Sequence, residues 1–402
     1  MIEIEEARRL VLEHVSPLGS ERVELRASLG RVLAEDVASP EDVPAFDNSA
    51  MDGFAVRAAE TRGARHDSPV TLRIVDESRA GHPATSRLGA GQAIAISTGG
   101  VIPTGVDAVI RVEETRAEDG LVEVLSEVEA HRDIRHAGED IRGGDTVLES
   151  GLRLGPAELG TLASLGRPSV ACARRPRVSV LTTGDELIEP DEPVRPGTVR
   201  NSNAYAVPAL AERAGAKVTG ITAVPDDPDV TRAAIARTLG SDVTVICGGV
   251  SVGAHDHVKQ ALADLGVEQV FWGVALKPGK PTWFGRHREG LVFGLPGNPV
   301  SAMVTFMLLV RPALIALSGG QPERRRTTAR LDRDYKKSPG RAHALRCRLQ
   351  LREDGWHVRP AERQGSHILT SMLGADALAI IPSASGDVAA GERVEIELLG
   401  DG

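Results

Sequence analysis

The sequence predicts a multidomain fold, in which a central doubly wound α/β domain is flanked by mostly β domains. Three observations support this prediction. Strand and helix candidates alternate between residues 178 and 310, short strand-like runs occupy residues 21–137, and polar and apolar residues alternate after residue 344. With 402 residues, the chain can build several domains that each have a hydrophobic core.

The N-terminal residues predict a short amphipathic helix at residues 2–15. A secretory signal is not expected, because this segment does not have a basic region followed by an apolar stretch. A second helix candidate spans residues 156–165. We group residues 1–20 with residues 138–172 as a linker or helical domain. The intervening residues 21–137 are expected to form a mostly β domain, with strand candidates at 70–75, 92–97 and 121–128.

The central region, residues 173–320, alternates strands and helices as parallel, doubly wound sheets do. Strand candidates lie at residues 178–183, 243–247 and 291–295, and helix candidates lie at residues 204–214 and 228–239. Residues that commonly cap helices precede both of them: Ser202 and Asn203 precede the first, and Asp226 and Asp227 precede the second.

The C-terminal region, residues 324–402, predicts a small β-sheet or barrel. Polar and apolar residues alternate at residues 344–351, 377–381 and 393–398. A Gly-Gly-Gln-Pro turn and a charge run at residues 319–326 precede this region and suggest a solvated linker.

The strands of the central region end in loops that are typical of ligand sites. Pro296 and Gly297 turn the chain, Asn298 can cap the next helix, and Pro299 suits its first position. Amides exposed at a helix N-terminus bind phosphate without a basic side chain. The other loops contain Gly184, Gly248, Gly249, Ser251 and Gly253. In a parallel sheet all these loops meet beyond the carboxyl ends of the strands, which predicts a phosphate-binding site there.

Acidic residues accompany these loops. Glu186, Asp226 and Asp256 lie in the central region, whereas Asp52 and Asp140 lie outside it. Carboxylates that face a phosphate need a cation between them, and Mg²⁺ combines a few carboxylate oxygens with phosphate oxygens. Each acid also has a structural interpretation, as a helix cap or a solvated loop residue. The pattern of residues leaves both interpretations open.

The turn from Lys277 to Pro281 holds two lysines, Lys277 and Lys280, between prolines and a glycine, which suits an oxyanion. Its alternative interpretation is a surface turn with solvated charges. His255 and His257 flank Asp256, but neighbours along a helix or strand point apart, which argues against a shared transition-metal site. The sequence has no G-x-S-x-G elbow, and no cysteine has a histidine near it in sequence, so covalent catalysis is not expected.

Composition narrows the class of protein. The net charge of −9 argues against a general nucleic-acid binder, which needs a basic surface. The three cysteines are widely spaced, so neither a disulfide framework nor a structural zinc site is expected, and a reducing cytoplasm fits. The most apolar run, residues 300–310, is shorter than the roughly 20 residues that cross a membrane, so we expect no membrane partner and a buried core helix there.

A set of motifs recurs in a fixed order along nearly the whole chain. The motifs are residues 48–55 (NSAMDGFA), Thr98-Gly99 with Asp107-Ala108-Val109, residues 138–141 (GEDI), residues 183–187 (TGDEL), the GGVSVG loop at 248–253, residues 277–281, residues 296–301 and residues 364–367 (QGSH). In these motifs the chain resembles the molybdopterin molybdenumtransferase family, which comprises the bacterial MoeA proteins and the E domains of gephyrin and the plant Cnx1 protein.

The resemblance implies a molybdenum insertase. Such an enzyme takes adenylylated molybdopterin, cleaves its pyrophosphate with Mg²⁺, inserts molybdate and releases AMP. The central region then becomes a molybdopterin-binding domain in an elongated homodimer. A molybdopterin adenylyltransferase and acceptor molybdoenzymes are the further partners that the resemblance suggests. Two alternatives remain, an adenylyltransferase-like enzyme, which lacks the flanking domains, and a non-catalytic scaffold.

The resemblance also implies roles for individual residues. Glu186, Asp226 and Asp256 become the metal-binding acids, supported by Asp140. Asp52 and Thr98 are expected to reach the cleft of the partner subunit. Molybdate is expected to lie against Lys277, Lys280, Ser301, Arg346 and Ser366, in a loop that Pro296 and Pro299 shape. Two positions depart from the family: Ala254 replaces an acid that many relatives carry, and Gly273 replaces a lysine that some carry.

Overall fold

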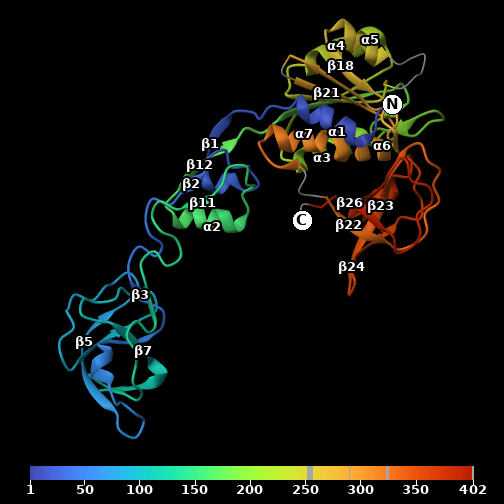
Figure 1. Cartoon of the computed structure of the whole chain (residues 1–402). Coiled ribbons are helices and arrows are strands. Elements are labelled where there is room, and N and C mark those ends of the chain that lie inside the picture. The colour runs from blue at the N-terminus through green and yellow to red at the C-terminus, as the bar shows by residue number, and fades with distance from the viewer. Residues whose placement is uncertain (251–256, 289, 323–325, 401–402) are drawn as a thin grey trace.

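The structure is a computed structural model that describes residues 1–250, 257–288, 290–322 and 326–400. The molecule is elongated (Figure 1). A β domain occupies one end, a small connecting region lies in the middle, and an α/β domain with a C-terminal barrel beside it forms the other end.

The α/β domain is built on a six-stranded sheet of order β16-β13-β17-β21-β20-β18. The first four strands of this order run parallel, and β20 and β18 are antiparallel to their neighbours. The predicted doubly wound sheet is therefore confirmed, with two antiparallel strands added at one edge. The strands are β13 (Arg177–Thr183), β16 (Lys217–Val224), β17 (Val243–Cys247), β18 (Glu268–Trp272), β20 (Trp283–His287) and β21 (Gly290–Leu295).

Helices cover both faces of this sheet. One face packs against α1, α3, α6, η4 and α7, and the other face packs against α4 and α5. The strands are apolar on both sides for this reason; in β17, Val245 faces the first group and Ile246 faces the second. The helices are α1 (Ile4–Glu13), α3 (Asn203–Arg213), α4 (Pro228–Thr238), α5 (His257–Asp264), α6 (Pro299–Thr305), the π-helical η4 (Phe306–Val310) and α7 (Arg311–Leu317).

The apolar run at residues 300–310 lies within the continuous helix Pro299–Leu317, which is 19 residues long and 83% buried over its most apolar window. By length and composition it meets the requirement for a membrane span. Its burial against the sheet identifies it as the core helix that the sequence predicts.

The β domain contains a six-stranded sheet of order β7-β4-β6-β5-β9-β8. Its core is formed by small and branched apolar residues such as Val56, Ala93 and Val122. The elements of this domain are β3 (Asn48–Ser49), β4 (Gly53–Val56), η2 (Ala58–Thr61), β5 (Val70–Ser78), β6 (Gln92–Ile96), β7 (Ala108–Arg111), η3 (Val112–Glu114), β8 (Thr115–Glu118), β9 (Leu121–Val124) and β10 (Ile134–Arg135).

The connecting region pairs β1 with β12 and β2 with β11, and helix α2 packs beside them. Residues 20–38 therefore pack in this region. Helix α1 packs against α7 and the sheet instead, because its apolar residues Ile4, Ala7 and Val11 join the core of the α/β domain. This packing differs from the expected grouping of residues 1–20 with the connecting region. The elements are β1 (Ser20–Glu24), η1 (Leu25–Ser28), β2 (Val37–Ala38), β11 (Thr146–Leu148), α2 (Pro156–Ser164) and β12 (Ser169–Ala173).

The C-terminal strands close into the barrel that the alternation of residues predicts. The order is β23-β24-β22-β26-β25, and a pairing of β25 with β23 completes the circle, while β19 adds to β23 from the α/β domain. The elements are β19 (Leu276–Lys277), β22 (Arg326–Leu331), β23 (Ala342–Arg352), β24 (Gly355–Pro360), η6 (Leu369–Met372), β25 (Ala377–Ile381) and β26 (Arg393–Leu398).

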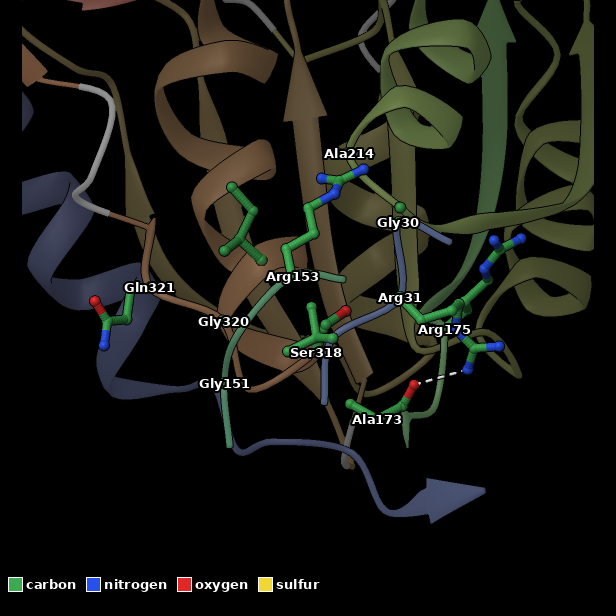
Figure 2. Close-up of a pocket in the computed structure, with 13 residues that line it drawn as sticks. Gly30, Arg31, Gly151, Arg153, Ala173, Arg175, Ala214, Ser318, Gly320 and Gln321 are labelled. Atoms are coloured by element: carbon green, nitrogen blue, oxygen red, sulfur yellow. Dashed lines mark hydrogen bonds between the residues drawn. The ribbon is translucent and has the colours of Figure 1, made fainter. Parts of the chain in front are cut away.

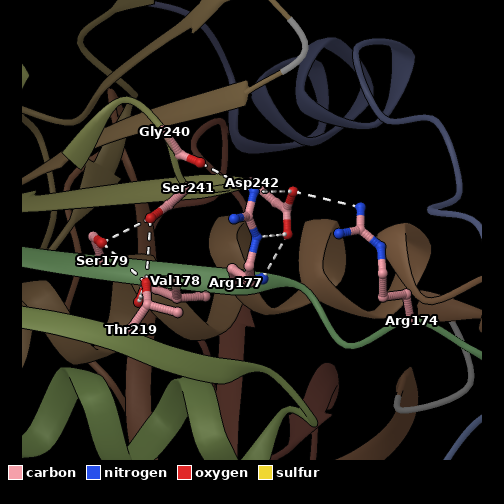
Figure 3. A network of polar contacts seen from close by, with 8 residues as sticks. All are labelled: Arg174, Arg177, Val178, Ser179, Thr219, Gly240, Ser241 and Asp242. Carbon is pink, nitrogen blue, oxygen red and sulfur yellow. Dashed lines mark hydrogen bonds and ion pairs between the residues drawn. The ribbon is translucent and has the colours of Figure 1, made fainter. Parts of the chain in front are cut away.

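Polar contacts tie together the amino ends of the parallel strands (Figure 3). Ser179 in β13 contacts Ser241 at 2.7 Å and Thr219 in β16 at 3.2 Å. Arg177 donates to the Gly240 carbonyl and pairs with Asp242. These contacts hold together the amino ends of the parallel strands, opposite to the glycine-rich loops at their carboxyl ends.

Candidate functional site

The glycine-rich loops converge at the carboxyl edge of the parallel strands, as the sequence predicts. The Gly248 amide donates to the Leu295 carbonyl at 3.0 Å, and the Asn203 side chain donates to the Gly297 carbonyl at 2.7 Å. A methyl group built on Gly297 would lie 3.8 Å from Gly248. We name this region the sheet-edge cradle, formed by residues 183–187, 201–203, 225–227, 248–250 and 296–298.

Two buried polar atoms in the sheet-edge cradle lack a hydrogen-bond partner among the described residues. They are the Thr183 hydroxyl and the Asn203 side-chain oxygen. A buried polar atom without a partner costs roughly 1–3 kcal/mol, so a polar ligand that reached either atom would recover that cost. The sequence places Thr183 at a strand end and Asn203 at a helix start, but no sequence signal marks either atom as unpaired.

The acids of the cradle lie close together. The Asp226 amide donates to the Asp185 carboxylate at 3.0 Å, and Glu186 folds back over Gly184. Burial raises the pKa of Asp226, and the nearby charges of Asp185 and Glu186 raise it further. Carboxylates that raise one another's pKa in this way attract a cation, and the charge interaction with His257 offsets only part of their effect on Asp226. Ser251, Gly253, His255 and Asp256 lie outside the described residues.

The donor chemistry of Glu186 and Asp226 fits Mg²⁺, which prefers carboxylate oxygens. Among the described residues, no group of three or more His, Cys, Asp or Glu side chains is placed to hold a metal ion.

Asp52 and Thr98 lie together in the β domain. The Thr98 amide and hydroxyl both donate to the Asp52 carboxylate, at 2.7 and 3.0 Å, and these bonds lower the pKa of Asp52. The β domain lies at the end of the elongated molecule opposite to the α/β domain, which carries the sheet-edge cradle (Figure 1). The exposed Asp140 belongs to the connecting region, where its amide donates to the Val43 carbonyl at 3.1 Å. Within one chain, therefore, these three residues do not join the cradle.

The start of α6 differs from its prediction in one respect. Pro299 occupies the first turn and Asn298 the N-cap position, but the described contacts give Asn298 no capping bond. Its side chain donates to the Ser366 hydroxyl at 3.3 Å, and the Ser366 carbonyl accepts from the Val300 amide at 3.2 Å. The predicted side-chain cap is therefore wrong, because a distant loop satisfies the amide that such a cap serves. This loop places Ser366 against Val300, the residue before Ser301, which is buried in the first turn of α6.

The start of α3 shows a similar difference. Ser202 and Asn203 precede or begin α3, but Asn201 accepts from the Ala204 amide at 3.2 Å, so it supplies the cap. At α4 the prediction is confirmed, since the Asp227 carboxylate accepts from the Val230 amide at 2.8 Å.

Arg346 is buried in β23, with 1% of its surface exposed. The hydrogen bonds described for its guanidinium go to the neutral acceptors Ser371, Ala344 and Gly365 at 3.1–3.4 Å. Burial lowers the pKa of this group. A buried cation whose described partners are all neutral is stabilised by an anion, and Gly365 places Arg346 beside Ser366.

Lys277 and Lys280 line a different hollow, which we name the basic basin. Its volume is about 740 Å³, and its walls include Lys336, Lys337, Arg341, His343 and Asp387. Within the described residues, no hydrogen bond or ion pair joins Lys277 or Lys280 to Arg346, Ser301 or Ser366. Lys277 and Lys280 line the basin, and Arg346 lines a different hollow on β23.

A sequence signal for the basin exists. Lys337-Ser-Pro-Gly-Arg341 repeats the pattern of Lys277-Pro-Gly-Lys280, with basic residues around a Pro-Gly turn. Our sequence analysis used only the first of the two turns. The pairing of β19 with β23, which sets Lys277 opposite His343, brings the two turns together.

A smaller hollow of about 170 Å³ lies between the connecting region and the α/β domain (Figure 2). Arg31, Arg153 and Arg175 line it together with Ala214 and Ser318, the C-cap residues of α3 and α7. Arg31 donates to the Ala173 carbonyl at 2.8 Å and pairs with Glu21. Because cations stabilise helix carboxyl ends, these arginines have a structural explanation.

We predict that Gly248→Ala damages the sheet-edge cradle. Gly248 has φ +101°, and an added Cβ would lie 2.8 Å from the Thr183 carbonyl oxygen. Backbone strain of this kind costs on the order of 1–3 kcal/mol. We expect weaker binding of pyrophosphate in equilibrium dialysis and a lower urea midpoint. Gly240→Ala is the matched control, since nothing lies within 4 Å of its added Cβ. Equal behaviour of the two variants would contradict the close packing of these loops.

Three family models match successive parts of the chain. Residues 2–166 match "MoeA N-terminal region (domain I and II)", residues 179–316 match "Probable molybdopterin binding domain", and residues 328–399 match "MoeA C-terminal region (domain IV)". Together they cover the β domain, the connecting region, the α/β domain and the barrel.

Relatives that match this chain over nearly its full length indicate the same family. A molybdopterin molybdenumtransferase of Haemophilus influenzae is 38% identical over 99% of this chain and 98% of its own, and one of Bacillus subtilis is 34% identical over 99% and 94%. A crystal structure of the molybdopterin biosynthesis MoeA protein from Pyrococcus horikoshii superimposes with a TM-score of 0.85. It is 32% identical and covers 99% of this chain and all of that one.

Proposed function

We propose that this protein is a transferase of molybdenum cofactor biosynthesis and inserts molybdenum into molybdopterin, because the chain belongs to the molybdopterin molybdenumtransferase family. The observation that carries this proposal is the sheet-edge cradle. It places the unpaired atoms of Thr183 and Asn203 beside Glu186 and Asp226 at the carboxyl edge of the sheet. Polar, phosphate-bearing ligands bind at this edge in doubly wound domains.

In finer detail, we propose that the substrate is adenylylated molybdopterin and that AMP leaves. Thr183 and Asn203 would hold polar groups of the nucleotide, and the loops at Gly248, Gly249 and Gly297 let phosphate oxygens approach the backbone closely. Ser251, Gly253 and Asp256 continue the same loop in sequence. The backbone amides of Gly248, Gly249 and Gly297 would orient the pyrophosphate by fixed dipoles, which is how electrostatic preorganisation lowers a barrier.

We propose that Glu186, Asp226 and Asp256 hold Mg²⁺, with Asp140 in support. When bound, the ion supplies positive charge to phosphate oxygens and orients them. The raised pKa of Asp226 supports this assignment, because a cation between Asp185, Glu186 and Asp226 relieves their mutual repulsion.

We propose that molybdate is the second substrate. Arg346, Ser366 and Ser301 form one group of residues for it, and Lys277 and Lys280 form another. The buried guanidinium of Arg346 supports the first group, because an oxyanion would compensate its charge. Pro296 and Pro299 hold the loop between the cradle and α6 in shape. We propose a cytoplasmic location and, as further partners, the adenylyltransferase that supplies the substrate and the acceptor molybdoenzymes.

The positions of Asp52 and Thr98 support a homodimer with shared sites, because one chain keeps them away from its own cradle. We predict that Asp52→Asn and Glu186→Gln are each nearly inactive. Mixed after dissociation and reassociation, they should recover about one quarter of wild-type turnover, since half of the dimers would hold one intact site of two. The control is each variant reassociated alone. A mixture no more active than either variant would contradict site sharing.

The experiment that tests the proposed function is turnover of adenylylated molybdopterin by the purified full chain. AMP release and molybdenum cofactor formation are measured with molybdate and Mg²⁺ present and with each omitted. We expect cofactor to form only when both are present. Tight binding of molybdopterin without turnover under every condition would instead support a scaffold.

A further inference from the structure

Trp272 ends strand β18 at the same edge of the sheet as the sheet-edge cradle. Strand β18 is antiparallel to β20, which is antiparallel to β21, so β18 runs in the direction of the parallel strands and ends at their carboxyl edge. Phe271 joins the core on the face that α1 and α7 cover. By alternation along the strand, the Trp272 side chain therefore points to the opposite face, where α5 packs.

The indole of Trp272 contacts one of the loops of the cradle. Its N–H donates to the Val250 carbonyl at 2.9 Å. Val250 belongs to the glycine-rich loop that begins at Gly248 and follows β17. The Lys259 ammonium of α5 lies over the indole, 4.6 Å from the ring centroid, which helps to hold the ring in place. The contact thus joins the loop after β17 to the end of a strand at the edge of the sheet.

The position of Trp272 is set by the sheet and not by the loop. Its backbone lies opposite Trp283 in β20, and the next amide, that of Gly273, donates to the Thr282 carbonyl at 2.9 Å. Both contacts belong to β20 or to the residue that precedes it. A side chain on such a rigid element can hold a binding loop more precisely than a side chain on another loop can.

The loop needs support of this kind. Gly248 and Gly249 have φ angles of +101° and +64°. Because glycine adopts positive and negative φ about equally well, their peptide units have little intrinsic preference for one orientation. In a phosphate-binding loop the amides face the anion and the carbonyls turn away from it, since a carbonyl oxygen repels an anion. Burial of the Val250 side chain fixes where the loop lies, and the indole fixes which way the Val250 carbonyl points.

We propose that Trp272 is a positioning residue for the loop at residues 248–250. Its indole N–H holds the Val250 carbonyl and thereby keeps the glycine peptide units in the orientation that receives phosphate groups. Trp272 acts through Val250 and does not touch the substrate. The inference rests on the proposed function for the identity of the phosphate-bearing ligand, but pyrophosphate alone can test it without turnover.

The test is equilibrium dialysis of the full chain with radiolabelled pyrophosphate in the presence of Mg²⁺. The variant Trp272→Phe keeps a flat apolar ring and removes the N–H that Val250 accepts from. Trp356→Phe is the matched control, because it makes the same chemical change at a similarly exposed indole, 44% against 37%, in β24 of the barrel. Melting curves confirm that both variants are folded.

We expect Trp272→Phe to weaken pyrophosphate binding about threefold to tenfold, the range that loss of one hydrogen bond produces, and Trp356→Phe to leave it unchanged. Equal binding by the two variants would overturn the positioning role. Failure of the wild type to bind pyrophosphate would overturn it as well, because the loop would then have no phosphate to receive.

Turnover separates a positioning role from a loss of stability. In Trp272→Phe we expect the KM for adenylylated molybdopterin to rise with the dissociation constant of pyrophosphate, while the KM for molybdate stays unchanged. Partial unfolding would lower kcat alone and move neither KM, and that result would contradict the inference. A wild type that binds pyrophosphate through a Trp272-dependent loop but forms no cofactor would refute the proposed function and leave the positioning role standing.

Discussion

A Glu186→Gln variant is expected to fold as the wild type does and to lose turnover by about 100-fold or more. Glutamine keeps the size of the side chain but removes one charge from the group of Asp185, Glu186 and Asp226 at the sheet-edge cradle. That charge is what would hold a cation against the phosphates of the substrate. The measurement is AMP release from adenylylated molybdopterin at saturating molybdate and a range of Mg²⁺ concentrations.

Glu189→Gln is the matched control for this result. Glu189 lies on the same exposed stretch and accepts from the Tyr205 hydroxyl at 3.0 Å, a bond that a glutamine oxygen can keep. We expect its turnover within about twofold of the wild type, as for most surface changes. If Glu186→Gln turned over as fast as Glu189→Gln at every Mg²⁺ concentration, Glu186 would have no part in the site.

A Glu397→Gln variant is expected to lose roughly 3–5 kcal/mol of stability. Glu397 is buried in β26 of the barrel, with 2% of its side chain exposed. Its two oxygens accept from Arg8 of α1 at 2.6 Å and from Arg311 of α7 at 2.5 Å. The change leaves two buried guanidinium groups without their counter-charge, where the barrel meets the α/β domain.

Urea unfolding, followed by tryptophan fluorescence and circular dichroism, measures this loss. Glu268→Gln is the control, because its pair with Arg286 is exposed on both sides and worth about 0–1 kcal/mol. We expect the Glu397→Gln barrel to detach before the sheet unfolds. Equal urea midpoints for the two variants would show that the Glu397 cluster does not hold the barrel in place.

Most of the fold could be predicted because local patterns decide it. The strand at Val243–Cys247 and the barrel strands Ala377–Ile381 and Arg393–Leu398 coincide with their apolar or alternating runs. The antiparallel strands β18 and β20 were not foreseen, since their pairing depends on contacts between distant residues. The packing of α1 on α7 had no local signal either, because an apolar stripe on a helix does not specify which element it packs against.

The site shows the same division. Loop glycines and acids follow strands in sequence, so their meeting at one sheet edge follows from topology alone. The separation of Lys277 from Arg346 does not follow from topology alone. Lys277 pairs with His343, and alternation along β23 directs His343 and Arg346 toward opposite faces of the barrel wall. The unpaired atoms of Thr183 and Asn203 depend on side-chain packing, which a sequence pattern does not specify.

The most direct test of the account is the stoichiometry of AMP and molybdenum. Purified protein is given adenylylated molybdopterin, Mg²⁺ and labelled molybdate, and released AMP is compared with molybdenum recovered in the pterin over single and multiple turnovers. The account predicts one AMP for each molybdenum inserted, and no cofactor when molybdate is left out. Steady AMP release at a rate independent of molybdate, or molybdenum inserted without release of AMP, would contradict the account.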